Sequence, residues 1–270
     1  MDSKKIKIAT CIPSHNDEKY IVESVKSVLD QNLNSNIQNM IFITFNNSSD
    51  SSLKELENKI LFNPKYENRP IFVDYQSKYQ GTSPTRNSLL QQIFWFEKQM
   101  STNIDYIAYN DADDVWIDKN KLQKQIDYLE SSTETDILGT QYIGRIKGIE
   151  TAPENYLLLD RRPLDHDSCL EWLFKGLNPI GNASVLYRRN TLFKIGMYED
   201  LFPLTEDMWF WYKAVLAGFK LSNLEDNCLL YNISSNPNYS SEYPLALSNM
   251  FQLIIKTRNN VQFSKTTKKQ

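Results

Sequence analysis

Apolar runs and helical apolar stripes alternate along the first half of this 270-residue chain. Strands are predicted where short apolar runs occur, and helices where apolar residues recur three or four positions apart. The predicted strands are residues 6–12 (ended by Pro13), 40–45, 70–75 and 104–109; the predicted helices are residues 17–30, a segment lined by Leu53, Leu56 and Ile60, residues 84–98, and a segment lined by Leu122, Ile126 and Leu129. This alternation predicts an α/β fold with a mainly parallel sheet covered by helices on both faces.

The pattern is looser after residue 135 and predicts a mixed second half. Residues 145–168 are polar and irregular. The predicted elements are strands at residues 136–144, 183–187, 219–224 and 228–233, and helices at residues 165–175, from about Glu206, and at 245–255. The last dozen residues are predicted to lack regular structure.

Three carboxylates, those of Asp111, Asp113 and Asp114, directly follow the fourth predicted strand. Ligands of parallel α/β sheets bind beyond the carboxyl ends of the strands, which is where these acids fall. Asp111 and Asp113 can present hard oxygen ligands to one Mg²⁺ or Mn²⁺ ion. Acid clusters after strands are also common as turn formers and helix caps, so the motif alone leaves both interpretations open.

Composition excludes several other classes of protein. Hydrophobic residues make up 41% and charged residues 23%, which is ordinary for a soluble globular protein, and a net charge of −3 provides no basic field for nucleic acid. The 8 glycines form neither dinucleotide-binding nor P-loop motif, so a nucleotide diphosphate must be neutralised by other means. A metal on the acid cluster is one such means.

Cysteine usage and hydropathy favour a soluble, cytosol-facing protein. The three cysteines are isolated in sequence, which is typical of a reducing compartment. We find no secretory signal and no apolar run of about 18 residues that could span a membrane. The lysines near both ends are interpreted as solvated tails, with weak contact to an anionic membrane as the less favoured alternative.

A series of short motifs over roughly residues 6–235 resembles the family-2-type nucleotide-sugar glycosyltransferases, which have the GT-A fold. The motifs occur in the family's order: residues 12–16 after the first strand, 48–50 after the second, Arg86-Asn87 on the third helix, 111–116 after the fourth strand, then 196–200, Glu206-Asp207 and 217–219. The resemblance implies a Rossmann-like sheet with a mixed C-terminal half that binds the acceptor. It implies one domain over residues 1–240, divided near residue 130 into nucleotide-binding and acceptor halves, followed by a helix and tail at 241–270.

The resemblance assigns the nucleotide-sugar site to residues of the first half. These are Pro13, Ser14, His15, Asn46, Arg86, Asp111, Ala112 and Asp113. His15 stands where the family often has an aromatic residue that stacks on the base; an ordinary turn histidine is the alternative. Asp113 is implied as the main ligand of Mn²⁺ or Mg²⁺, assisted by Asp111. Arg86 is implied to face the phosphates, with a helix-surface ion pair as the alternative.

The pair Glu206-Asp207 is the second implied centre, with Asp207 as the general base that deprotonates an acceptor hydroxyl. Acids in a first helical turn are also favoured by the helix dipole alone. Trp209 and Trp211 are candidates for stacking on an acceptor sugar, as Asn182 is for binding it; packing in the core is the alternative for the tryptophans. One displacement with one base inverts the anomeric configuration.

Two departures from the family pattern affect the expected function. Phe45 and Asn46 stand where the family commonly has two acids, so the usual contact to uridine is in question. The residues after the last strand include no histidine to serve as a third metal ligand. The expected partners are a UDP-, GDP- or dTDP-sugar and a glycan or glycoconjugate acceptor. An inactive nucleotide-binding module and a nucleotidyltransferase remain alternatives, and oligomeric state stays open.

Overall fold

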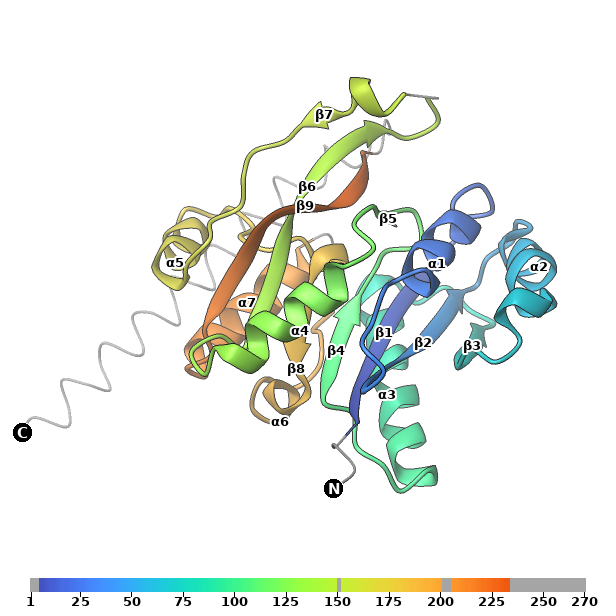
Figure 1. The fold of residues 1–270 in the computed structure, drawn as a ribbon, viewed down its shortest axis with the longest axis horizontal. Coiled ribbons are helices and arrows are strands. Elements are labelled where there is room, and N and C mark those ends of the chain that lie inside the picture. The colour runs from blue at the N-terminus through green and yellow to red at the C-terminus, as the bar shows by residue number, and fades with distance from the viewer. Residues whose placement is uncertain (1–4, 150–151, 201–204, 234–270) are drawn as a thin grey trace, which may run out of the picture.

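The computed structural model describes residues 5–149, 152–200 and 205–233. In these residues a single nine-stranded sheet has the order β3-β2-β1-β4-β8-β6-β9-β5, with β7 paired to β6 (Figure 1). The strands are β1 Ile6–Ser14, β2 Ile37–Asn46, β3 Ile71–Gln76, β4 Tyr106–Tyr109, β5 Val115–Trp116, β6 Ile137–Ile146, β7 Leu157–Leu158, β8 Leu186–Arg188 and β9 Leu221–Ile233. The helices are α1 Ile21–Leu29, α2 Ser52–Leu56, α3 Thr82–Gln99, α4 Lys121–Ser131, α5 His166–Phe174, α6 Leu192–Ile195 and α7 Glu206–Leu216, with a π-helical turn at Glu57–Leu61.

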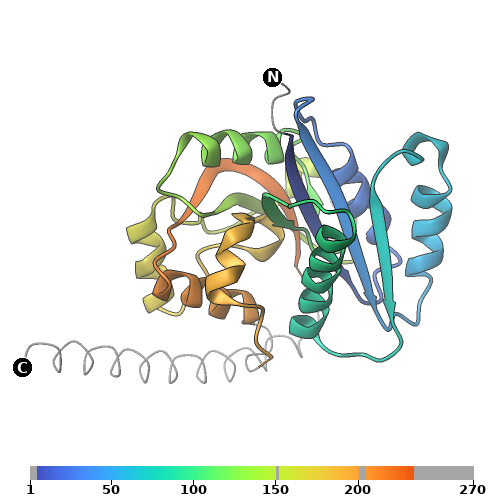
Figure 2. The same ribbon diagram turned by 90° about the horizontal axis from the view of Figure 1, so that it is seen from below.

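Helices cover both faces of the sheet, as the alternation predicted. Along β1, Ala9 and Cys11 pack into the cluster that contains residues of α3 and α7, whereas Ile8 and Ile12 pack into the cluster that contains residues of α1, α2 and α4. Figure 2 shows α3 on one side of the parallel strands and α1 and α2 on the other. The predicted α/β fold is therefore confirmed.

The first four strands are parallel and the rest of the sheet is mixed. β1 pairs in parallel with β2 and β4, and β2 with β3. β8 then runs antiparallel to both β4 and β6, while β9 is parallel to β6. The carboxyl ends of β1, β2 and β4 consequently meet at one edge, where the predicted site residues follow each strand.

Two predicted boundaries are wrong for identifiable reasons. Pro13 does not end the first strand, because β4 pairs with β1 only as far as Cys11 and Pro13 lies where β1 has β2 as its sole neighbour. The two strands predicted at 219–224 and 228–233 form one strand, β9. Its polar middle, residues 225–227, is exposed, and pairing with β6 continues across a register shift near Gln141.

The remaining predicted elements are present with shifted ends. The helix predicted from residue 17 begins at Ile21, preceded by a turn in which the Tyr20 amide donates to the Asp17 carbonyl at 2.9 Å. The strand predicted at 183–187 begins at Leu186, after a 3-10 turn. The helix predicted at 245–255 lies outside the described residues.

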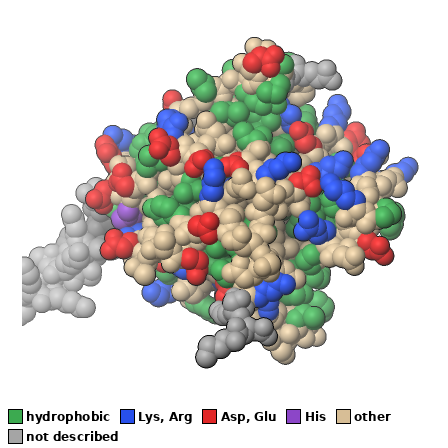
Figure 3. Space-filling view, in the orientation of Figure 1, with side chains coloured by type: hydrophobic (Ala, Val, Ile, Leu, Met, Phe, Trp, Pro, Cys, Tyr) green, Lys and Arg blue, Asp and Glu red, His purple; other side chains and the backbone are tan. Residues whose placement is uncertain are grey.

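Within the described ranges, no helix combines the length and the apolar character needed to span a bilayer. Basic and acidic side chains are interspersed on the face in Figure 3.

Candidate active site

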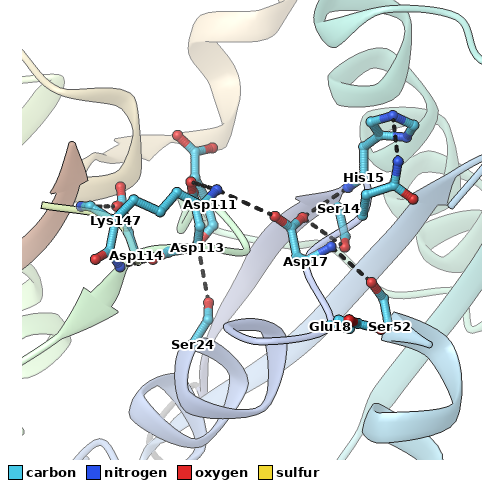
Figure 4. Close-up of polar contacts among 12 residues, drawn as sticks. Ser14, His15, Asp17, Glu18, Ser24, Ser52, Asp111, Asp113, Asp114 and Lys147 are labelled. Carbon is cyan, nitrogen blue, oxygen red and sulfur yellow. Dashed lines mark hydrogen bonds and ion pairs between the residues drawn. The ribbon is translucent and has the colours of Figure 1, made fainter. Parts of the chain in front are cut away.

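The acid cluster lies in the turn that joins β4 to β5, and helix α1 holds this turn in place. The Asn110 side chain donates to Ser24 Oγ at 2.8 Å, and Ser24 Oγ donates to the Asp111 carbonyl at 3.1 Å. Within the turn, the Asp114 amide donates to the same carbonyl at 3.0 Å. These bonds orient the carboxylates at the carboxyl edge of the parallel strands (Figure 4).

Each of the two predicted metal ligands is paired with a basic side chain. Arg86 Nη1 lies 3.0 Å from Asp111 Oδ1, and Lys147 Nζ lies 2.8 Å from Asp113 Oδ2. The Asp111 and Asp113 side chains are 29% and 28% exposed, so both remain accessible from solvent. Like charges this close are costly when unpaired, and the two cations offset that repulsion.

Arg86 links the acid cluster to the acid pair at the start of α7. Its Nε lies 3.1 Å from Glu206 Oε1, and its side chain is only 6% exposed. Burial opposes the charged guanidinium, but the carboxylates of Asp111 and Glu206 raise the pKa of Arg86 above its ordinary value. One buried arginine therefore joins Asp111 and Glu206, which are far apart in sequence. The ion pairs of Arg86 are therefore buried and do not lie on the helix surface, and its role at phosphates stays a prediction.

Asp207 is held beside this bridge by two hydrogen bonds. Asn178 Nδ2 donates to Asp207 Oδ2 at 2.7 Å, and the Met208 amide donates to Oδ1 at 2.7 Å. Burial, followed by the neighbouring charge of Glu206, raises the pKa of Asp207 to about 7. A carboxylate with a pKa near neutrality suits proton transfer at physiological pH.

His15 and Tyr79 form an aromatic pair where β1 and β2 end. Their ring centroids are 4.7 Å apart, and His15 Nδ1 is 2.7 Å from the Asn46 carbonyl oxygen. Both polar ends of the Asn46 side chain are engaged with the loop before α3: its Nδ2 donates to the Gly81 carbonyl at 3.3 Å and its Oδ1 accepts from the Gln80 amide at 3.0 Å. Asn46 thus holds this loop and positions the His15 ring.

Comparison with known proteins identifies the family. The model of glycosyl transferase family 2 matches residues 10–190, well over half of the chain. The chain belongs to glycosyl transferase family 2. Consistent with this, it is 24% identical over 243 residues to an uncharacterized glycosyltransferase of Methanocaldococcus jannaschii, covering 87% of this chain and 73% of that protein.

Solved structures share the fold of this family 2 glycosyltransferase. TarS of S. aureus (residues 1–349), in complex with UDP-GlcNAc, aligns with a TM-score of 0.62 at 20% identity, covering 87% of this chain and 61% of that one. The mannosyltransferase PcManGT of Pyrobaculum calidifontis, in complex with GDP-Man and Mn²⁺, aligns with a TM-score of 0.62 at 11% identity, covering 86% and 59%. The predicted GT-A fold is confirmed, and the chain spans about 60% of the length of these two structures.

The Asp111 and Asp113 carboxylates can supply part of the ligand set of a divalent cation. Among the described residues, no three His, Cys, Asp or Glu side chains gather closely enough to hold a metal by themselves. Mg²⁺ is commonly held by one or two carboxylates plus substrate phosphates, and Asp111 and Asp113 supply that number. Asp114 adds a buried oxygen, because its Oδ1 accepts from the Asn232 amide at 2.8 Å while its Oδ2 has no hydrogen-bond partner among the described residues.

The candidate acceptor residues lie in the core or at its margin. Trp211 is fully buried and donates its indole N–H to the Ile180 carbonyl at 3.0 Å, and Trp209 is 6% exposed with its indole N–H 3.0 Å from Glu199 Oε2. Of the two interpretations left open for the tryptophans, the structure supports core packing. Asn182 is 4% exposed and its Oδ1 accepts from the Tyr198 hydroxyl at 3.1 Å.

Other predicted nucleotide residues also have packing roles. Ser14 is 3% exposed and donates to Asp17 Oδ2 at 3.0 Å, while Pro13 lies within β1. Ala112 is 2% exposed and belongs to the core cluster beneath α1 and α4. Neither Ser14 nor Ala112 presents a large side-chain surface to a ligand.

Besides Tyr79 of the aromatic pair, sequence reasoning missed the side chains of Asp17, Lys147 and Asn178. Asp17 is 8% exposed, and burial, followed by the charge of Asp113, raises its pKa to about 6. Its position directly after the matched segment 12–16 was an available signal. Lys147 and Asn178 lie in connections of the second half, and no local pattern marks either of them.

Proposed function

We propose that this protein transfers a sugar from a nucleotide-diphosphate donor to a hydroxyl acceptor with inversion at the anomeric carbon. The observation that carries the proposal is the Arg86 bridge, with Asp111 at 3.0 Å and Glu206 at 3.1 Å. Arg86 contacts Asp111, in the cluster proposed to hold a metal and diphosphate, and also Glu206, next to the proposed base Asp207. The donor and the acceptor can therefore bind next to each other, between these two groups of carboxylates.

The donor half of the reaction involves the acid cluster and the aromatic pair. The base is expected to stack on His15 and Tyr79, and the diphosphate to lie along Asp111 and Asp113. A bound Mn²⁺ or Mg²⁺ supplies Lewis-acid stabilisation of the charge that develops on the departing nucleoside diphosphate. Arg86 holds Asp111 in place and contributes a fixed positive charge beside the same group.

The acceptor half of the reaction depends on Asp207. Its carboxylate takes the proton of an acceptor hydroxyl as that oxygen forms a bond to the anomeric carbon, and the bond from this carbon to the diphosphate oxygen breaks. The nucleoside diphosphate leaves with the bonding electron pair, and Asp207 ends protonated. Asn178 and the Met208 amide keep the carboxylate aimed during the step, and Glu206, held by Arg86, positions the start of α7.

The alternatives predict different behaviour with the same ligands. A binding module of this fold retains nucleotide affinity but shows no turnover. A nucleotidyltransferase normally binds phosphate with a glycine- and lysine-rich loop, which this chain lacks.

The cysteines Cys11, Cys169 and Cys228 are all free and buried, in keeping with a reducing, cytosol-facing compartment.

A thermal-shift screen of UDP-, GDP- and dTDP-sugars, with and without Mn²⁺, tests the proposal. A ligand that binds only the folded protein stabilises it by ~2.7 kcal/mol at ~100 times its Kd, so a true donor raises the Tm by several degrees. Nucleoside monophosphates serve as the matched control because they lack the diphosphate, and we expect them to shift the Tm less. If no nucleotide sugar raises the Tm and none is hydrolysed, the proposal is wrong.

The pH dependence of transfer is expected to report Asp207. A general base must be deprotonated, and its pKa is about 7, so kcat/KM should fall about tenfold per pH unit below about pH 7 and level off above it. Rates measured from about pH 5.5 to 8.5 at fixed Mn²⁺ concentration give the profile. In the Asp207→Asn variant this titration should disappear from the residual rate. Retention of the same titration by that variant would assign it to another group.

A further inference from the structure

Lys147 occupies a cradle for a cation within the acid cluster. Its Nζ lies 2.8 Å from Asp113 Oδ2 and 4.0 Å from Asp17 Oδ1, and it stands 4.7 Å from the centroid of the Tyr20 ring. Figure 4 shows the lysine side chain reaching between the two carboxylates. Two carboxylates and an aromatic face together form a favourable environment for a positive charge.

The main chain at Lys147 is anchored, whereas its side chain can move away from Asp113 and Asp17. Lys147 follows the last residue of β6, and its amide donates to the Ile233 carbonyl at 2.9 Å, which anchors the main chain. Gly148 follows with φ +83°, a conformation that residues with a Cβ rarely adopt, and a Cβ placed there meets no atom within 4 Å. The side chain is 29% exposed, so its ammonium can move into solvent or toward a bound ligand without disturbing the core.

The ammonium and a divalent cation would share the carboxylate of Asp113. Asp113 Oδ2 accepts the Lys147 hydrogen bond at 2.8 Å, and Asp113 is one of the two carboxylates proposed above to hold the metal. A divalent ion at Asp113 would lie only a few ångströms from the ammonium, where like charges repel strongly. In the same turn, Asp114 Oδ2 is buried and has no hydrogen-bond partner among the described residues.

We propose that Lys147 is the resident counter-ion of the free site, and that it competes with the divalent cation for Asp113. Donor diphosphate relieves the competition, because its negative charge gives the displaced ammonium a new partner. This inference rests on the proposed function and adds an order of events: the cation enters together with the diphosphate and binds weakly without it. By linkage, each of the two ligands strengthens the binding of the other by the same factor.

Titration of the nucleotide-free protein with Mn²⁺ alone tests the competition, with bound Mn²⁺ followed by electron paramagnetic resonance. Lys147→Met should bind Mn²⁺ about tenfold more tightly than the unmodified protein, because a like charge has been removed from beside the ion. Lys147→Arg keeps the charge and should bind as weakly as the unmodified protein. Lys124→Met is the matched control, since Lys124 pairs with Asp118 and Asp226, outside this cluster.

The same titration in an Asp113→Asn background separates competition from a general structural effect. There Lys147→Met should bring no gain in Mn²⁺ affinity, because the shared carboxylate has been replaced by a neutral amide. A second arm measures how far UDP or GDP raises the Mn²⁺ affinity, and this factor should be smaller in Lys147→Met than in the unmodified protein.

The outcomes distinguish this inference from the proposed function. Mn²⁺ affinity that is unchanged or lower in Lys147→Met, with the fold intact by circular dichroism, overturns the competition. The metal-only titration involves no donor, so its result does not depend on whether nucleotide sugars bind. Conversely, absence of nucleotide-sugar binding and turnover in the unmodified protein counts against the proposed function, whatever Lys147→Met does with Mn²⁺.

Discussion

Asp207→Asn is expected to lower sugar transfer by about 10²–10⁴-fold while leaving nucleotide binding nearly intact. The amide is close to the carboxylate in shape, and its single oxygen can still accept one of the two hydrogen bonds, from Asn178 or from the Met208 amide, but it cannot take a proton at neutral pH. The residues proposed to bind the donor, Asp111 and Asp113, are untouched. Initial rates at saturating donor, together with calorimetric titration of the nucleoside diphosphate, provide the two measurements.

A matched control for this variant lies at the start of another helix. Asp167 is an exposed acid in the first turn of α5, as Asp207 is in the first turn of α7, so Asp167→Asn makes the same chemical change at a helix N-terminus outside the proposed site. We expect it to retain full transfer. Unchanged transfer in Asp207→Asn would remove Asp207 from the mechanism and leave the helix dipole as the reason for its position.

The fold could be predicted from the sequence because the first half contains clear apolar runs and apolar residues at helical spacing. The apolar run at the start of the chain lies in β1, and the stripe through Val25 and Val28 is the buried face of α1. Boundaries failed where tertiary pairing overrode local signals. Pro13 lies inside a strand because only β2 flanks it, and the exposed polar residues 225–227 lie inside β9 because β6 continues to pair around them.

The candidate site could be predicted in part, because several of its residues directly follow a predicted strand or begin a predicted helix. The acids after β4 and the acid pair at the start of α7 were both identified from sequence, and Arg86 was assigned to the phosphates. Its contact with Glu206 was not predicted, because no local pattern records how α7 packs against α3. The same limit applies to Lys147, whose place beside Asp113 depends on the path of β6.

The tryptophans of α7 show another limit of sequence reasoning, because it made them binding candidates whereas the structure buries them. Trp209 and Trp211 are in the right region for acceptor stacking by sequence, yet both are buried, and Trp211 lies in a core with Phe210. Sequence spacing places a side chain on a helix, but the neighbouring elements decide whether that face meets solvent or core. If Asp207 is the base, as proposed, other residues must contact the acceptor.

Asp113→Ala is expected to abolish the effect of Mn²⁺ on donor binding. Asp113 is proposed to hold a cation against the diphosphate, and metal stabilisation of a leaving group is worth several kcal/mol, which corresponds to a loss in transfer of about 10²-fold or more. The variant should fold, because Asp113 is partly exposed, Arg86 still pairs with Asp111, and Lys147 still faces Asp17. Calorimetry of nucleoside diphosphate binding with and without Mn²⁺ measures the effect directly.

The control for Asp113→Ala is Asp127→Ala on α4, an exposed acid whose Oδ1 accepts from Gln123 at 2.7 Å, and we expect its Mn²⁺ response to equal that of the unmodified protein. The comparison also tells two roles of the acid turn apart. If Asp113 only pairs with Lys147, its removal should leave the Mn²⁺ response in place. If it holds the cation, the Mn²⁺ response should vanish, while the hydrogen bonds of Asn110, Ser24 and Asp114 still maintain the turn.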